Sequence, residues 1–365
     1  MGLLRVLLAI SVVIAHSSPI MGLSLVGGRI AVQTFYIISG FYMALILSEK
    51  YVGKNGRYSL FLSNRLLRLY PVYWVVLIGT IALFFFLGWY TDGAYGTKLD
   101  LYREYLGKMG IGEFLFLLVS NVVLFFQDAV MFFGVNPETG GLYFTRNFLS
   151  AEPGLYEFLF LPQAWTLGIE LLFYVIAPFI IRRKTWVILI IAGLSLGLRG
   201  YLYFGLDLNH DPWTHRFFPT ELFFFLLGIL GYRMHKALKG WEHSKRVGEI
   251  ALGLILLLTV IFSLISWSGF QYVYFLLFFL GLPFIFERTK RWKWDRTIGE
   301  LSYPVYICHL LILEAILALA LPQPGGLGLV LTVLSVVAAI VLNRLIAMPI
   351  ERIRQKRVSQ RATAG

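Results

Sequence analysis

An arginine and a histidine, Arg5 and His16, stand at the two ends of the apolar stretch that opens the chain. Eleven helical residues turn about 1100° and rise about 16 Å, so both side chains lie on one face of a helix. A histidine at membrane depth needs a partner or a cavity, and its neutral ring can take a proton from a hydroxyl. The spacing therefore predicts a functional His16, with a packing histidine as the alternative. Arg5 is either a ligand-binding cation or an ordinary interfacial anchor.

A second pair of cations, Arg65 and Arg68, lies three residues apart in "RLLRLYPVYW". This spacing places them on one helix face just before an apolar run. Guanidinium groups bind phosphate through paired hydrogen bonds, so the two arginines suit a phosphorylated ligand at the membrane surface. The alternative is that both only anchor the following span, where arginines and aromatic residues are common.

Ionisable side chains also fall inside later apolar runs, at Glu170 and at His309. Such groups are costly in hydrocarbon and face a partner or a cavity. The Glu170 carboxylate therefore needs a partner, for example a histidine. His309 is a second such group. Tyr306, close to it in the sequence, is either a site residue or a packing residue.

The composition places these residues in a membrane. The chain has 365 residues, of which 58% are hydrophobic and 14% charged, and its mean hydropathy is +0.74. Soluble domains carry about 25% charged residues. We expect an all-α integral membrane protein, because apolar runs of spanning length recur along the whole chain. The ten predicted spans are residues 3–20, 28–48, 71–89, 162–181, 186–204, 217–234, 247–266, 270–287, 298–320 and 327–346.

Segment 113–133 is apolar enough to cross, but it holds three polar side chains, Asn121, Gln127 and Asp128. Basic residues gather in cytoplasmic loops. If this segment does not cross, all basic clusters of the chain share one side. We therefore expect it to form a re-entrant or interfacial helix, with both termini cytoplasmic. The net charge of +12 mostly reflects this asymmetry, so we expect no nucleic-acid partner.

The domain organisation follows from the same pattern. We expect a single membrane-embedded domain over residues 1–350, with 90–161 as its long outer stretch and 351–365 as a basic cytoplasmic tail. Cys308 is the only cysteine, which excludes an internal disulfide. We expect no metal site, and the sequence leaves the oligomeric state open.

Six motifs occur in an order that resembles acyltransferase family 3 of membrane proteins over residues 3–350. Each motif is weak alone, but the set matches the family's order and its ten-span layout. The motifs are the Arg5-to-His16 spacing, "FYIISGF" with Ser39, "RLLRLYPVYW" with Arg65 and Arg68, "WTLGIELLFY" with Trp165, Glu170 and Tyr174, "PTELFFFLLG" from Pro219, and "LSYPVYICH" with Tyr306 and His309.

Two positions depart from the family pattern. Gln33 stands where family members often have an acidic residue, and Leu171 follows Glu170 where they often have a second glutamate. Gln33 weakens any proposal that a carboxylate in the second span orients His16. Leu171 leaves Glu170 as the single acidic residue of its motif.

The resemblance implies transfer of an acyl group, usually acetyl, from cytoplasmic acyl-CoA to a hydroxyl of a glycan or lipid-linked saccharide. This would be O-acetylation in polysaccharide biosynthesis, by a multi-pass protein among the lipids of a bacterial-type inner membrane. Arg5, Arg65 and Arg68 would bind the donor, and His16 would be a general base or an acyl-accepting nucleophile, assisted by Glu170. The substrate-orienting residues would be Ser39, Trp165, Tyr174, Tyr306 and His309.

A second class of function stays open at this point. Buried histidine, glutamate and arginine side chains in ten spans also suit a secondary transporter or a glycan flippase. Transporters often show inverted repeats with broken helices at corresponding positions. We detect no such repeat in the sequence, which favours the transferase.

Overall fold

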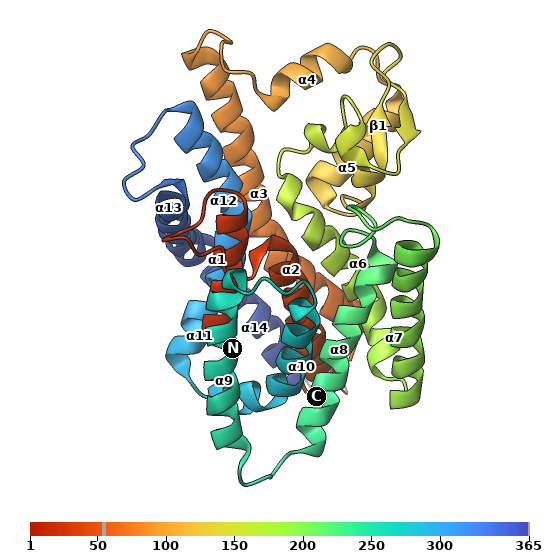
Figure 1. Cartoon of the computed structure of the whole chain (residues 1–365), viewed down its shortest axis with the longest axis vertical. Coiled ribbons are helices and arrows are strands. Elements are labelled where there is room, and N and C mark those ends of the chain that lie inside the picture. The colour runs from red at the N-terminus through yellow and green to blue at the C-terminus, as the bar shows by residue number, and fades with distance from the viewer. Residues whose placement is uncertain (53–55, 364–365) are drawn as a thin grey trace.

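The computed structural model describes residues 1–52 and 56–363, and side chains through residue 358. Helices form nearly all of its regular structure (Figure 1), which confirms the predicted all-α fold. Their bounds are α1 Gly2–Ala15, α2 Gly27–Glu49, α3 Tyr58–Tyr90, α4 Lys98–Tyr105, α5 Ile111–Val123, α6 Trp165–Ile181, α7 Thr185–Gly200, α8 Phe218–Ala237, α9 Ser244–Ile261, α10 Phe270–Thr289, α11 Lys293–Gly299, α12 Ser302–Ala318, α13 Leu327–Leu342 and α14 Met348–Thr363.

Shorter elements complete the chain. Strands β1 (Phe133–Val135) and β2 (Leu142–Phe144) pair antiparallel, with Phe133 opposite Phe144. Two stretches of π-helix, Tyr201–Gly205 and Asn343–Ala347, follow α7 and join α13 to α14. The 3₁₀ turns are Ala129–Phe132, Phe148–Ser150, Leu155–Phe158, Pro162–Ala164 and Phe262–Leu264.

All ten predicted spans are helical, but two of them differ from the prediction. Within the described part of the chain, eight helical runs are long and apolar enough to cross a membrane. The helix α1 is too short to be among them, and α8 carries Glu221 and Arg233 along its length. The eight runs are Gly27–Glu49, Tyr58–Tyr90, Pro162–Ile181, Thr185–Gly205, Ser244–Leu264, Phe270–Thr289, Lys293–Ala318 and Leu327–Val358.

The first helix, α1, is shorter and more enclosed than the sequence predicts. It ends at Ala15 and not at residue 20, since Pro19 disfavours helical backbone at Ser18 just before it. Leu4 and Leu8 are fully buried, and α1 contacts α2, α11, α12 and α13. The short helix thus lies inside the bundle, where its neighbours cover both Arg5 and His16 in part.

Segment 113–133 is α-helical only in its first half. The helix α5 ends at Val123, and Leu124 then adopts a left-handed conformation. Thirteen helical residues reach about 20 Å, well short of the roughly 30 Å of a hydrocarbon core. The Tyr70 hydroxyl donates to the carbonyl of Val123, and the Tyr73 hydroxyl to that of Asn121. Aromatic residues of α3 therefore cap the C-terminus of α5, as one expects of a helix that stops inside the protein.

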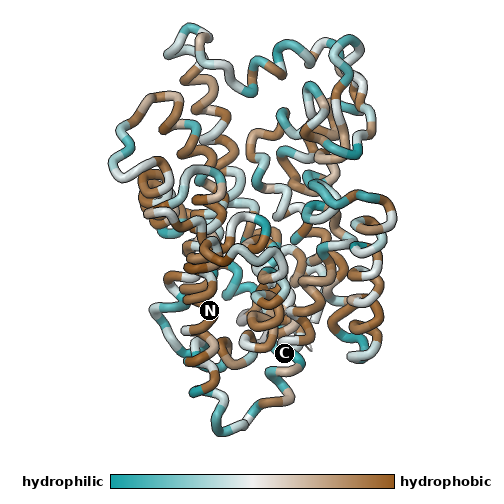
Figure 2. Tube along the Cα trace, viewed as in Figure 1, coloured by the Kyte–Doolittle hydropathy of each residue, from teal (hydrophilic) through white to brown (hydrophobic). Residues whose placement is uncertain are grey.

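The two ends of the chain lie in the same half of the molecule, opposite α4 and β1 (Figure 1). The Met1 amine forms an ion pair of 2.6 Å with Asp295 in α11. The stretch expected as a tail is helical through Thr363 as part of α14, and Arg357 of α14 donates at 3.0 Å to Asn64 near the start of α3. Figure 2 shows hydrophobic residues along the helices and hydrophilic residues concentrated in the connections at both ends.

Helices α2 and α8 pack backbone against backbone. A Cβ atom at Gly40, in "SGF", would overlap the carbonyl oxygen of Phe225, and one at Gly228 would overlap that of Ile37. Only glycine permits this approach. The close contact fixes the position of Ser39 and its neighbours along the axis of α2 relative to α8.

Candidate functional site

Two cavities meet in the middle of the helix bundle. The inner cavity, of about 120 Å³, lies between α1, α2, α3, α6 and α12, and the outer one, of about 390 Å³, lies in the half of the molecule that holds both termini. Four side chains line both of them: Arg5, Tyr42, Arg68 and Tyr303. The cavities therefore form one path, and two arginines stand where its halves join.

The inner cavity is built around a carboxylate. Ser39 of α2 and Tyr174 of α6 each donate a hydrogen bond of 2.6 Å to the same oxygen of Glu170, and all three side chains line the cavity. Glu170 and Tyr174 are four residues apart on α6 and so share one helix face. The glutamate thus has two neutral donors in place of the histidine that we expected beside it.

The two arginines of the "RLLRLYPVYW" motif occupy different environments. Arg68 is exposed and lines both cavities. Arg65 is buried at 5% exposure, and among the described residues it belongs to the wall of neither cavity. The two arginines are one helical turn apart, and only Arg68 reaches the surface of the cavities.

His16 and His309 come together beyond the inner cavity. Their ring centroids are 5.0 Å apart, and the ring of Tyr306, which lines the cavity, is 6.0 Å from that of His309. His309 is fully buried, whereas His16 is exposed. Their proximity could not be predicted from the sequence, because 293 positions separate the two histidines.

Backbone carbonyls fix the tautomers of both rings. Nδ1 of His16 lies 2.9 Å from the oxygen of Val12, and Nδ1 of His309 lies 2.6 Å from that of Tyr306. A carbonyl oxygen only accepts, so each Nδ1 carries the proton and each Nε2 keeps its lone pair. The buried Nε2 of His309 has no hydrogen-bond partner within the described chain. Both rings are thus set up to accept a proton at Nε2.

Tyr306 is held in place by the start of α6. Its hydroxyl donates to the carbonyl oxygen of Gln163 at 2.7 Å and lies 2.8 Å from the hydroxyl of Thr166. The Gln163 amide donates at 2.8 Å to the carbonyl of Ile307. These bonds tie α12, which carries His309, to the "WTLGIE" end of α6.

Sequence reasoning missed a group on the loop before α8. The Arg216 guanidinium lies 4.4 Å from the ring centroid of Trp165, and its Nε donates to both oxygens of Asp211, at 2.9 and 2.8 Å. The His215 ring lies 5.1 Å from the same tryptophan. Burial, together with the positive charge of Arg216, lowers the pKa of His215 well below its usual range, so this ring is neutral. The only signal of this group in the sequence is the run of aromatic and basic residues in "WTHR".

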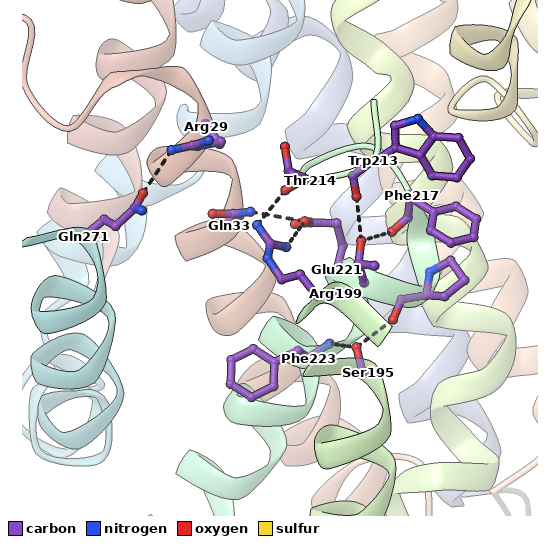
Figure 3. Close-up of polar contacts among 12 residues, drawn as sticks. Arg29, Gln33, Ser195, Arg199, Trp213, Thr214, Phe217, Glu221, Phe223 and Gln271 are labelled. Carbon is purple, nitrogen blue, oxygen red and sulfur yellow. Dashed lines mark hydrogen bonds and ion pairs between the residues drawn. The ribbon is translucent and has the colours of Figure 1, made fainter. Parts of the chain in front are cut away.

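Gln33, one of the two positions that depart from the family pattern, belongs to a buried network (Figure 3). Its amide donates to Oε1 of Glu221 at 3.1 Å, and Arg199 forms an ion pair of 2.8 Å with the same oxygen. Arg199 also donates at 2.6 Å to the carbonyl of Thr214. The network joins α2, α7 and α8 to the loop that carries His215 and Arg216. Within the described residues, no group of three or more His, Cys, Asp and Glu side chains converges on a metal position.

Comparison with known proteins gives one family and one relative. A family described as "Acyltransferase domain" matches residues 1–348. A protein of Aquifex aeolicus (strain VF5), described as uncharacterized, is 24% identical over 162 residues, which cover 41% of this chain and 69% of the relative. No solved structure matches the chain significantly.

Proposed function

The chain belongs to acyltransferase family 3, and we propose that it moves an acyl group, acetyl in the simplest case, from cytoplasmic acyl-CoA to a sugar hydroxyl. A multi-pass membrane protein of this kind would act on a glycan or a lipid-linked saccharide at a bacterial-type inner membrane. The observation that carries the proposal is the histidine pair, two rings 5.0 Å apart with their Nε2 lone pairs available, next to Tyr306 in the wall of a cavity that Arg5 and Arg68 also line.

The donor would occupy the path from the outer cavity inward. Its phosphates are anionic, and Arg5 and Arg68 stand at the junction of the two cavities. The pantetheine arm would pass Ser39, Glu170 and Tyr174, whose polar groups suit its two amides. The roughly 16 Å rise of α1 from Arg5 to His16 fits the length of this arm. The thioester would then lie beside Tyr306 and the two histidines.

His16 would perform the chemistry because it is the exposed member of the pair. As a general base, its Nε2 takes the proton of the acceptor hydroxyl, the oxygen attacks the thioester carbonyl, and the carbon–sulfur bond breaks. The departing thiolate then receives the proton from the imidazolium. As a nucleophile, Nε2 would instead attack the thioester carbonyl, break the carbon–sulfur bond and release the CoA thiolate, which leaves the acyl group on the imidazole. The acceptor hydroxyl would then attack this acyl group, the nitrogen–carbon bond would break, and the hydroxyl proton would pass to the thiolate.

Two other residues would assist. The Nε2 of His309 would accept a hydrogen bond from the acceptor hydroxyl, or from a donor group next to the thioester carbonyl, and so hold that group in place. The backbone carbonyl of Tyr306 would fix the orientation of the His309 ring. Glu170 would act on the donor side, where its contacts with Ser39 and Tyr174 orient it toward the cavity. The loop of His215 and Arg216 would close the chamber over Trp165 and exclude water.

The test uses purified full-length protein with acetyl-CoA and a panel of soluble sugars, and it follows release of free thiol. We expect thiol release that depends on both the protein and an acceptor. Mass spectrometry of protein incubated with donor alone separates the two mechanisms, because only the nucleophilic one leaves an acetyl group on His16. Absence of thiol release and of donor hydrolysis under all conditions would refute the acyltransferase proposal.

A further inference from the structure

The C-terminal helix α14 forms part of the wall of the outer cavity. The family match ends at residue 348, and α14 begins at that residue. Four of its side chains line the cavity: Met348, Ile350, Glu351 and Arg354. Hydrogen bonds of 3.0 Å from Arg357 to Asn64 and to Ser63 hold the helix against α3. A segment outside the matched family region therefore shapes the cavity in which the donor's nucleotide end would lie.

The lining of the outer cavity carries an excess of positive charge. Six cationic groups face three carboxylates, a difference of three positive charges. The cations are the Met1 amine, Arg5, Arg68, Lys290, Arg296 and Arg354, and the acids are Asp295, Glu300 and Glu351. A concave surface with this balance attracts a polyanion and holds it more tightly at low ionic strength.

Arg354 is the most enclosed of the α14 cations. Its side chain is 7% exposed, it pairs with Glu351 one turn earlier, and its buried Nε has no hydrogen-bond partner among the described residues. The positive charges of Arg65 and Arg68 also act on it. A buried guanidinium with an unused donor and two cationic neighbours is costly unless an anion completes the site.

The position of Arg354 along the path indicates which anionic group of the donor would lie beside it. Arg5 and Arg68 line both cavities and so lie at the level where the pantetheine arm meets the diphosphate. Arg354 lines only the outer cavity and so lies farther from the histidines. In CoA the group beyond the diphosphate is the ribose with its 3′-phosphate. A phosphate monoester of this kind carries about −1.5 to −2 charges and three acceptor oxygens, which suit a guanidinium fork.

We propose that Arg354 on α14 binds the 3′-phosphate of the acyl-CoA donor and thereby distinguishes CoA from 3′-dephospho-CoA. The proposal rests on the proposed function, because it assigns one part of the same donor to one residue. Arg354 is a donor-binding residue here and takes no part in the transfer step. The helix α14 is then a functional part of the donor site.

The test compares the affinities of two ligands by calorimetry on purified full-length protein, with CoA and 3′-dephospho-CoA as the probes. We expect the wild type to bind CoA at least about tenfold more tightly, as one charge-assisted contact permits. Arg354→Gln should weaken CoA binding by about tenfold or more and leave 3′-dephospho-CoA binding within about twofold. Arg354→Lys should lose less CoA affinity, because lysine keeps the positive charge but lacks the paired N–H donors of the guanidinium. Arg352→Gln is the matched control, since Arg352 is exposed on the same helix and does not line the cavity within the described chain.

Each contrary result has a separate meaning. Unchanged CoA affinity in Arg354→Gln, or an equal loss for both ligands, would overturn the assignment of Arg354 while CoA binding itself stands. Arg68→Gln reports on the proposed function independently, because it should weaken the binding of both CoA and 3′-dephospho-CoA. Failure of the wild type to bind either ligand would overturn the proposed function and this inference together. If Arg354→Gln does not fold, the ratio of the two affinities in Arg354→Lys decides the matter.

Discussion

At the scale of single residues, exposure separates two histidines that otherwise look alike. Both rings donate Nδ1–H to a backbone carbonyl and keep Nε2 free, but His309 is fully buried and His16 is exposed. A ring that must meet both a donor and an acceptor has to be reachable. The backbone carbonyl of Val12 also performs the orienting task that a carboxylate performs in a triad.

We expect His16→Ala to reduce the rate of acetyl transfer by at least about 10²-fold, which is the usual lower bound for loss of a general base. The protein should still insert and purify, because the side chain is exposed and alanine removes only its ring contact with His309 and its hydrogen bond to Val12. The rate of thiol release from acetyl-CoA in the presence of acceptor measures the effect. His243→Ala, an exposed histidine next to α9, is the matched control. Near-normal transfer by folded His16→Ala would contradict the mechanism.

The two arginines three residues apart should differ in kinetics. We expect Arg68→Ala to raise the donor KM by about ten- to a hundredfold with little change in kcat, because it removes a charge-assisted contact at the cavity surface. Arg65→Ala should raise the donor KM less, since its buried side chain lies behind that surface. Steady-state kinetics with varied donor measure both, with Arg103→Ala at the opposite end of the molecule as the control. An equal or larger KM effect of Arg65→Ala would contradict this placement.

Six residues that the motifs predicted line the inner cavity: Ser39, Glu170, Tyr174, Tyr306, Arg5 and Arg68. Their roles there stay predictions. The tautomer contacts could not be predicted, because they depend on backbone carbonyls that every residue carries. The loop of His215 and Arg216 could not be predicted either, because it reaches Trp165 only through the packing of α7 and α8.

At the scale of helices, the ends were harder to predict than the helices themselves. Hydrophobic periodicity indicated a segment from 113 to 133, but α5 ends at Val123, where three aromatic side chains of α3 supply hydrogen bonds. Those partners lie about 50 positions earlier in the chain. A helix end set by tertiary contacts leaves no local signal, whereas Pro19 does mark the region where α1 stops.

The contact between α2 and α8 gives a prediction about stability. We expect Gly40→Ala to lower the free energy of unfolding by about 1–3 kcal/mol, because the new Cβ meets the backbone at Phe225, which cannot move aside as a side chain can. Thermal unfolding in detergent measures the change. Gly88→Ala in α3 is the matched control, since no described atom lies within 4 Å of a Cβ there. Equal melting temperatures for the two variants would show that α2 and α8 do not pack this closely.

At the scale of the whole molecule, the path to the histidines has a direction. The outer cavity is lined by Met1 and by residues of α11 and α14, which lie in the half of the molecule opposite α4 and the β1–β2 ribbon (Figure 1). Acyl-CoA is made and kept in the cytoplasm, so the proposed function requires the half with the outer cavity to be cytoplasmic. The distribution of basic residues in the sequence predicts the same orientation.

Cysteine labelling in intact cells tests this orientation directly. The single native cysteine, Cys308, is 1% exposed, so an impermeant maleimide should react little with the wild type. We expect Glu138→Cys, on the exposed turn between β1 and β2, to label without permeabilisation. Arg183→Cys, in the turn between α6 and α7, and Arg352→Cys on α14 should label only after permeabilisation. The reverse pattern would place the arginine-lined cavity outside the cell, away from acyl-CoA, and labelling of all three from one side would contradict the arrangement of the spans. Either result would leave the histidine pair intact but would remove its proposed donor.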